Sequence, residues 1–194
     1  MFKFDALKLG KFALIISMLG IIIQLEGCKE DKKKINAPAP VEIPDEKTNL
    51  TVQRFENDLF GIEKMDSLSV EKLRNKYGEF FDIWCLRLAA IASPSMLAKI
   101  DNKVILPTSP QLITNLHDYT HDQYIREVYQ ESKKQFTDIS SIQEGLTNAF
   151  SRYKVAFPNK KIPTITTYIS PFYSSITALD NNLGIGLHSY FGSD

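Results

Sequence analysis

Cysteine is almost absent from this sequence: Cys28 and Cys85 are the only two among its 194 residues. Two cysteines cannot build a disulfide-stapled domain, and they cannot form a zinc cluster made of cysteines alone. Apolar residues are plentiful, since they make up 43% of the chain and include 12 Phe, 8 Tyr and one Trp. The chain therefore has enough apolar side chains for a core without covalent crosslinks.

An excess of either charge is also missing, because 23 Lys and Arg balance 23 Asp and Glu. Binding to nucleic acid depends on clustered positive charge that neutralises phosphates. The charge balance therefore predicts that nucleic acid is not the partner of this protein.

No apolar run is long enough to cross a membrane stably. The N-terminal run, FALIISMLGIII, covers only residues 12–23. A helix of that length reaches about 18 Å, whereas the hydrocarbon core of a bilayer is about 30 Å thick. The run follows Lys3, Lys8 and Lys11 and has no polar face, which disfavours a buried core helix. Its length and position are typical of a secretory signal peptide.

A cysteine stands at the end of this signal, in the stretch LEGC. The stretch resembles a bacterial lipobox, with Leu25 at position −3, the small Gly27 at −1 and Cys28 as the lipidated residue. Glu26 departs from the small or aliphatic residue usual at −2. A thiolate is a strong nucleophile and suits the transfer of a diacylglyceryl group. We expect residues 1–27 to be a signal peptide and Cys28 to carry two or three acyl chains, which anchor durably. The alternative is a free thiol that follows an ordinary signal.

Residues 28–48 are predicted to form a tether that links the lipidated cysteine to the globular part. Lys29, Glu30 and Asp31 resemble the tag that follows the lipidated cysteine in surface-exported Bacteroidetes lipoproteins. A solvated spacer is the alternative, so the surface and the periplasmic face both remain open. The proline-rich APAPVEIP at 37–44 predicts an extended segment without a core.

Residues 49–194 predict one globular α+β domain, mostly helical in its first two thirds. We expect a strand from Leu50 with a turn at Asn57–Asp58, and a helix that Ser67 or Ser69 caps and Gly78 ends. The dense apolar stretch Glu79–Ala92 predicts a buried helix, in which Cys85 is a small buried hydrophobe.

Helix-start signals and a change to β-branched residues organise the second half. The pattern predicts a helix that starts at Ser109–Pro110, one from Thr120 through Phe136, and an amphipathic one from Ser141 to Pro158. The stretch Ile162–Ser170 predicts a strand, and Leu183–Gly192 predicts its antiparallel partner. A strand that runs up to Asp194 would leave a long sheet edge unpaired, so we expect the chain to be the N-terminal part of a longer domain.

One stretch, HDYTHD, imitates a metal site. His117 and His121 are four residues apart, and Asp118 stands where zinc proteases place a glutamate. Catalytic zinc needs a third protein ligand, for which His188 or a carboxylate remains. We expect Thr120 to cap a helix and so to separate the two histidines, which favours two surface residues in a loop. The sequence also lacks a glycine-rich phosphate loop and a G-x-S-x-G motif, and we assign no catalytic residue, metal or cofactor.

Five stretches in order resemble the GldB family of gliding-motility lipoproteins from Bacteroidetes. They are VQRFENDLF (52–60), LRNKYGEFF (73–81), LTNAFSRYKVAFP (146–158), PTITTYIS (163–170) and IGLHSYFGSD (185–194). With the lipoprotein signal before them, they spread the resemblance over nearly the whole globular part, about residues 50–194. His188 and Ser189 stand where the family usually has an acid and a bulky residue.

The resemblance implies a lipid-anchored envelope protein, held in the outer membrane, that acts as a structural or interaction component of the gliding apparatus. It implies other gliding-motility and type IX secretion proteins as partners, and no enzyme activity. The alternative is a metallopeptidase-like hydrolase, active or degenerate, whose site would lie beyond residue 194.

Overall fold

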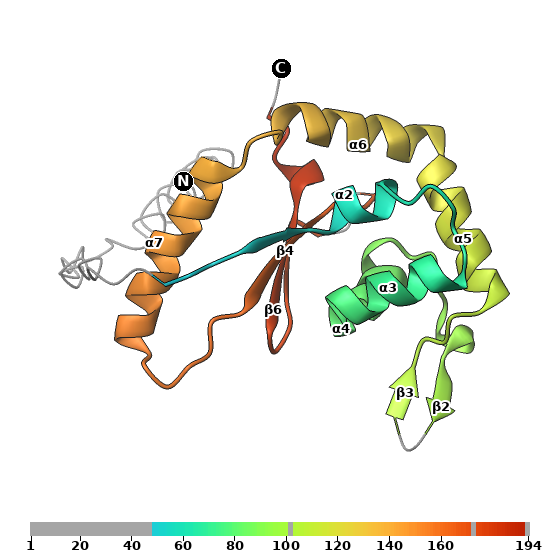
Figure 1. Ribbon diagram of the computed structural model, residues 1–194, viewed down its shortest axis with the longest axis horizontal. Coiled ribbons are helices and arrows are strands. Elements are labelled where there is room, and N and C mark those ends of the chain that lie inside the picture. Colours follow the sequence, from blue (N-terminus) through green and yellow to red (C-terminus); the bar gives the residue numbers. More distant parts are fainter. Residues whose placement is uncertain (1–47, 101–102, 172–173, 193–194) are drawn as a thin grey trace, which may run out of the picture. The chain divides into compact units, whose positions relative to one another are not determined.

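The computed structural model describes residues 48–100, 103–171 and 174–192, which form an α+β fold (Figure 1). The predicted signal peptide and nearly all of the predicted tether lie outside the described residues. The strands are β1 (Val52–Arg54), β2 (Ala98–Ile100), β3 (Lys103–Ile105), β4 (Thr164–Tyr168), β5 (Ile176–Ala178) and β6 (Asn182–Gly186). The α-helices are α2 (Phe55–Phe60), α3 (Ser67–Tyr77), α4 (Glu79–Ile83), α5 (Pro110–His121), α6 (Gln123–Gln135) and α7 (Ser140–Ala156).

A four-stranded mixed sheet in the order β1-β4-β6-β5 forms the centre, and β2 and β3 form a separate hairpin. Strand β4 pairs in parallel with both β1 and β6, whereas β5 pairs with β6 in antiparallel fashion. A C-terminal antiparallel hairpin is present, as predicted, but β5 and β6 form it. The prediction that the strand around Leu183 runs antiparallel to β4 is wrong. The three-residue β5 takes the antiparallel place, and the chain then returns to lie alongside β4.

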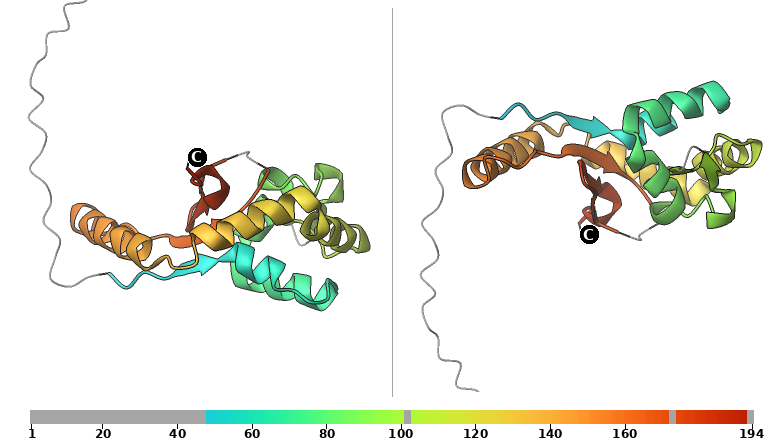
Figure 2. Two further views of the ribbon diagram at one scale, coloured as in Figure 1. Left: turned by 90° about the horizontal axis from the view of Figure 1, so that it is seen from above. Right: turned by 90° about the horizontal axis from the view of Figure 1, so that it is seen from below.

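The two faces of the sheet pack against different helices (Figures 1 and 2). On one face, Val52 and Ile165 pack against Leu146 and Phe150 of α7. The opposite face packs against a larger core that α2 to α6 supply. Alternate residues of a strand point to opposite faces, so β4 contributes Ile165 to the smaller core and Tyr168 to the larger one.

The larger core is built around aromatic rings. Phe55 touches Tyr77 and Trp84 edge to face, with ring centroids 4.9 and 4.8 Å apart. Trp84 also donates a hydrogen bond from Nε1 to the Ile169 carbonyl at 3.0 Å, which satisfies its buried N–H group. A Cβ atom at Gly184 would lie 2.8 Å from Phe80 Cε2, so this aromatic core requires glycine on β6.

The first helices differ from their predicted boundaries. The predicted turn at Asn57–Asp58 is wrong, because α2 continues through Phe60. The cap of α3 is Asp66, whose side chain accepts a hydrogen bond from the Ser69 amide while Ser69 Oγ accepts one from the Asp66 amide. Ser69 is therefore the partner in a capping box and not the cap itself.

The predicted helix Glu79–Ala92 is broken into two pieces. Helix α4 passes at Trp84 into a π-helical turn, Trp84–Leu88, and the chain then leaves the helix at Ala90 with φ of 53°. The predicted burial is confirmed, since Cys85 is fully buried. Burial raises the pKa of the Cys85 thiol well above its usual range.

Two of the later helix starts were misplaced. The start of α5 is confirmed, since Ser109 Oγ accepts a hydrogen bond from the Leu112 amide at 3.2 Å. Thr120 lies inside α5, however, and Asp122 caps α6 by accepting from the Ile125 amide at 3.0 Å. Helix α7 starts at Ser140, after Ile139, without a side-chain cap, so its start lies one residue before the predicted Ser141.

Candidate functional site

The residues predicted to form the lipidation site lie outside the described residues. They are Leu25, Gly27, Cys28 and the tag residues Lys29, Glu30 and Asp31. Lipidation therefore stays a prediction. Within residues 48–100, 103–171 and 174–192, no helix combines the length and apolar character needed to cross a bilayer.

Buried polar side chains gather where the parallel strands end. Ligands of sheets with parallel strands often bind at the carboxyl ends of those strands. Here Glu56 follows β1, Thr167 and Ser170 lie at the end of β4, and His188 follows β6. Each of these four residues is at most 3% exposed to solvent. This cluster is the first candidate for a functional site.

A charged network forms one half of the cluster. Arg54 donates from Nε to Glu56 Oε1 at 2.5 Å, and Thr167 Oγ1 donates to Glu56 Oε2 at 2.8 Å. Arg54 also donates from its NH1 nitrogen to the Phe136 carbonyl at 2.9 Å, just beyond α6. Both carboxylate oxygens thus have partners, so the network suits a clamp that joins β1, β4 and α6. Sequence reasoning missed it, although the charged pair in QRFE, at the end of a strand, was a usable signal.

Ser170 and His188 form the other half. The Ser170 amide donates to His188 Nδ1 at 3.3 Å, and Ser170 Oγ lies 3.4 Å from Nε2. Burial lowers the pKa of His188, which favours the neutral imidazole. Both residues are covered from solvent, so a substrate could not reach the serine oxygen in this conformation. The pair therefore fastens the end of β4 to the segment after β6.

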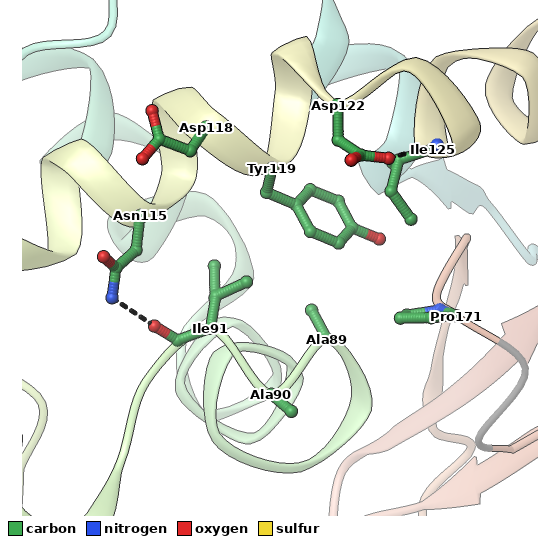
Figure 3. A pocket seen from close by; sticks show the side chains of 9 residues that line it. All are labelled: Ala89, Ala90, Ile91, Asn115, Asp118, Tyr119, Asp122, Ile125 and Pro171. Atoms are coloured by element: carbon green, nitrogen blue, oxygen red, sulfur yellow. Dashed lines mark hydrogen bonds between the residues drawn. The ribbon is translucent and has the colours of Figure 1, made fainter.

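An open cleft of about 540 Å³ lies between the turn after Leu88, the junction of α5 and α6, and Pro171 (Figure 3). Three of its polar side chains already make hydrogen bonds within the fold. Asn115 donates to the Ile91 carbonyl at 2.6 Å, and the Tyr119 hydroxyl donates to the Ile169 carbonyl at 3.4 Å. Asp122 caps α6. The cleft therefore offers shape but few groups that are available for chemistry.

An apolar groove of about 290 Å³ opens between α7 and the sheet. It is lined by Val52, Phe136, Ile139, Ile142, Leu146, Thr167, Ile185, Leu187 and Tyr190. Ile142 remains 39% exposed and Tyr190 48% exposed at its edge. A groove with so few polar groups suits an apolar side chain from another protein.

The histidines of HDYTHD are not separated by a helix boundary. His117 and His121 both belong to α5, which ends after His121, so the prediction that places them in a loop is wrong. His188 does not join them, because it lies at the strand ends with Ser170. In the described part of the chain, no three His, Cys, Asp or Glu residues are grouped as a metal site would need.

Comparison with models of known protein families identifies the class of protein. The match covers residues 36–194, which include the whole described fold, and it defines a gliding-motility protein. The chain belongs to the family of the gliding motility protein GldB. A search of curated proteins found no match, and a search of solved structures found none.

Proposed function

We propose that this protein is a lipid-anchored envelope component of the bacterial gliding-motility apparatus, linked to type IX secretion. The family match from residue 36 onward carries the proposal. The lipobox supports the anchor, because Cys28 directly follows the signal run and precedes a proline-rich stretch. An acylated cysteine would hold the domain at the outer membrane without a membrane-spanning helix.

The proposed role of the domain is to bind partner proteins of the gliding and secretion machinery. The apolar groove beside α7 supports this role, because binding surfaces are enriched in exposed apolar patches. The buried polar cluster supports it indirectly. Its Glu56 carboxylate bonds to the Thr167 hydroxyl, and its His188 imidazole bonds to Ser170. These two pairs each tie β4 to a neighbouring segment, which suits a rigid binding module.

Metabolic labelling with an alkyne fatty acid tests the anchor. We expect label on the wild-type protein and none on Cys28→Ala, because the acyl chains need the thiol. Cys85→Ala is the matched control and should keep its label, since Cys85 is buried in the core. Equal label on wild type and Cys28→Ala would refute the anchor. Protease treatment of intact cells then assigns the face: a digested domain lies outside, and a protected one lies in the periplasm.

Crosslinking in gliding cells tests the binding role. We expect Ile142→Gln, at the edge of the groove, to lose crosslinks to other gliding proteins and to reduce gliding. Leu68→Gln on α3 is the control, because Leu68 is 61% exposed and lies outside the groove. If both variants crosslink and glide like the wild type, the groove is not the binding surface.

A further inference from the structure

Two imidazole rings lie side by side on the last turn of α5. The ring centroids of His117 and His121 are 4.0 Å apart, and the ring planes differ by 17°. Both side chains are exposed, and His117 retains 54% of its side-chain exposure. Residues four apart share one face of a helix, which accounts for the close approach. The arrangement requires that α5 continue past Thr120, as the structure shows.

The hydrogen bonds of the two rings determine which nitrogen carries the proton. His121 Nδ1 lies 2.7 Å from the His117 carbonyl oxygen, which can only accept, so Nδ1 of the neutral ring donates. His117 Nδ1 lies 3.2 Å from Asp118 Oδ1, and the carboxylate likewise accepts. In each neutral ring the lone pair therefore resides on Nε2. Histidine ligands of metals have this arrangement, with one nitrogen donating to a carbonyl or carboxylate and the other bound to the metal.

We propose that His117 and His121 form a two-histidine site for a divalent transition-metal ion on the surface of α5. Imidazole nitrogen suits Cu²⁺, Ni²⁺ and Zn²⁺, and affinity generally rises towards Cu²⁺ in this series. One ion could bind both Nε2 atoms at about 2.0–2.1 Å once the two side chains rotate out of their stacked arrangement, so that their lone pairs converge. Water would fill the other positions. The bound ion would crosslink the final turn of α5, directly before Asp122, which caps α6.

The site differs from that of a hydrolytic zinc enzyme. A hydrolytic site needs three protein ligands in a shielded cavity, whereas these two histidines are exposed on a helix. Its expected properties are reversible binding and a preference for soft or borderline metals over Mg²⁺. An ion that binds only the folded chain raises the melting temperature, and the rise grows with metal concentration.

Thermal melting in the presence of metal ions tests the site. The sample is the full-length chain in detergent, carrying Cys28→Ala to remove the competing thiol and an affinity tag without histidine. We expect the melting temperature to rise with Cu²⁺, and less with Ni²⁺ and Zn²⁺, but not with equal Mg²⁺. His117→Ala and His121→Ala should each weaken the apparent affinity on the order of a hundredfold, because chelation is lost.

The double variant should bind no more weakly than either single variant, because the loss of one histidine already abolishes chelation. Gln123→Ala, an exposed neighbour beyond His121, should bind like the parent. Electron paramagnetic resonance of bound Cu²⁺ should show coupling to two imidazole nitrogens in the parent and fewer in each single variant. No metal-dependent shift in the parent, or a shift that survives in both single variants, would overturn the proposal.

Discussion

Replacing Arg54 by methionine isolates the energy of the buried network at the strand ends. The variant leaves the Glu56 carboxylate, whose side chain is 0% exposed, with the Thr167 hydroxyl as its hydrogen-bond donor. It also removes the donor to the Phe136 carbonyl. Breaking a buried ion pair by removing one partner costs about 3–5 kcal/mol. Arg54 keeps 17% of its side-chain exposure, so we expect a loss near the low end, about 3 kcal/mol.

The double variant Arg54→Met, Glu56→Met provides the sharper test. Replacing a whole buried pair by apolar side chains is often neutral, so the double variant should be about 2 kcal/mol more stable than Arg54→Met alone. Arg87→Met is the matched control, because Arg87 is exposed on the π-helical turn, and its effect should stay within about 0.5 kcal/mol.

Urea unfolding monitored by tryptophan fluorescence measures these free energies. Trp84 is the single tryptophan of the chain and is fully buried, so its emission reports loss of the core. The single variant Glu56→Met completes the comparison. If the double variant loses as much free energy of unfolding as Arg54→Met and Glu56→Met lose together, Arg54 and Glu56 do not act as a unit. That result would refute the description of the network as an energetic clamp.

Three further predictions follow from the packing and the burial. Gly184→Ala should destabilise the protein by about 1–3 kcal/mol in urea unfolding, because its Cβ would clash with Phe80. Gly145→Ala in α7 is the control: its Cβ meets nothing within 4 Å, so it should stabilise by about 0.5–1 kcal/mol. Equal effects of the two variants would contradict the packing around Gly184. Burial lowers the pKa of His188, so the unfolded chain takes up a proton that the folded chain does not, and stability should fall as the pH drops through about 6.5. His188→Asn should lose that part of the slope between about pH 7.5 and 5.5, and an unchanged slope would exclude His188 as its source. Cys85 in the Cys28→Ala background should resist iodoacetamide until urea unfolds the protein, because the buried thiol stays protonated; rapid labelling of the native protein would contradict its burial.

Local patterns predicted the elements whose signals lie in neighbouring residues. The start of α5 at Ser109–Pro110 and the strand around Ile165 are confirmed, since a cap or a β-branched run acts over a few residues. Capping was less secure where several candidates competed. Thr120 and Asp122 both had suitable side chains, and only the packing of the last turn of α5 assigned the cap to Asp122.

The candidate site depended on contacts between distant residues. The hydrogen bond from Thr167 to Glu56 spans 111 positions in the chain, and the one from Arg54 to Phe136 spans 82. No periodicity in the sequence could reveal either. The stacked pair His117 and His121 was visible as a spacing, but it required one unbroken helix, which the misplaced boundary at Thr120 had excluded.

The sequence by itself determined the α+β class, the burial of Cys85 and the resemblance to the gliding-motility family, because composition and short-range patterns carry those properties. Only the tertiary structure decided that β6 runs parallel to β4 and that charged and polar side chains meet at the strand ends. The physical reason is that strand direction and buried pairing depend on which distant segments exclude water together, and this choice is made by the whole core.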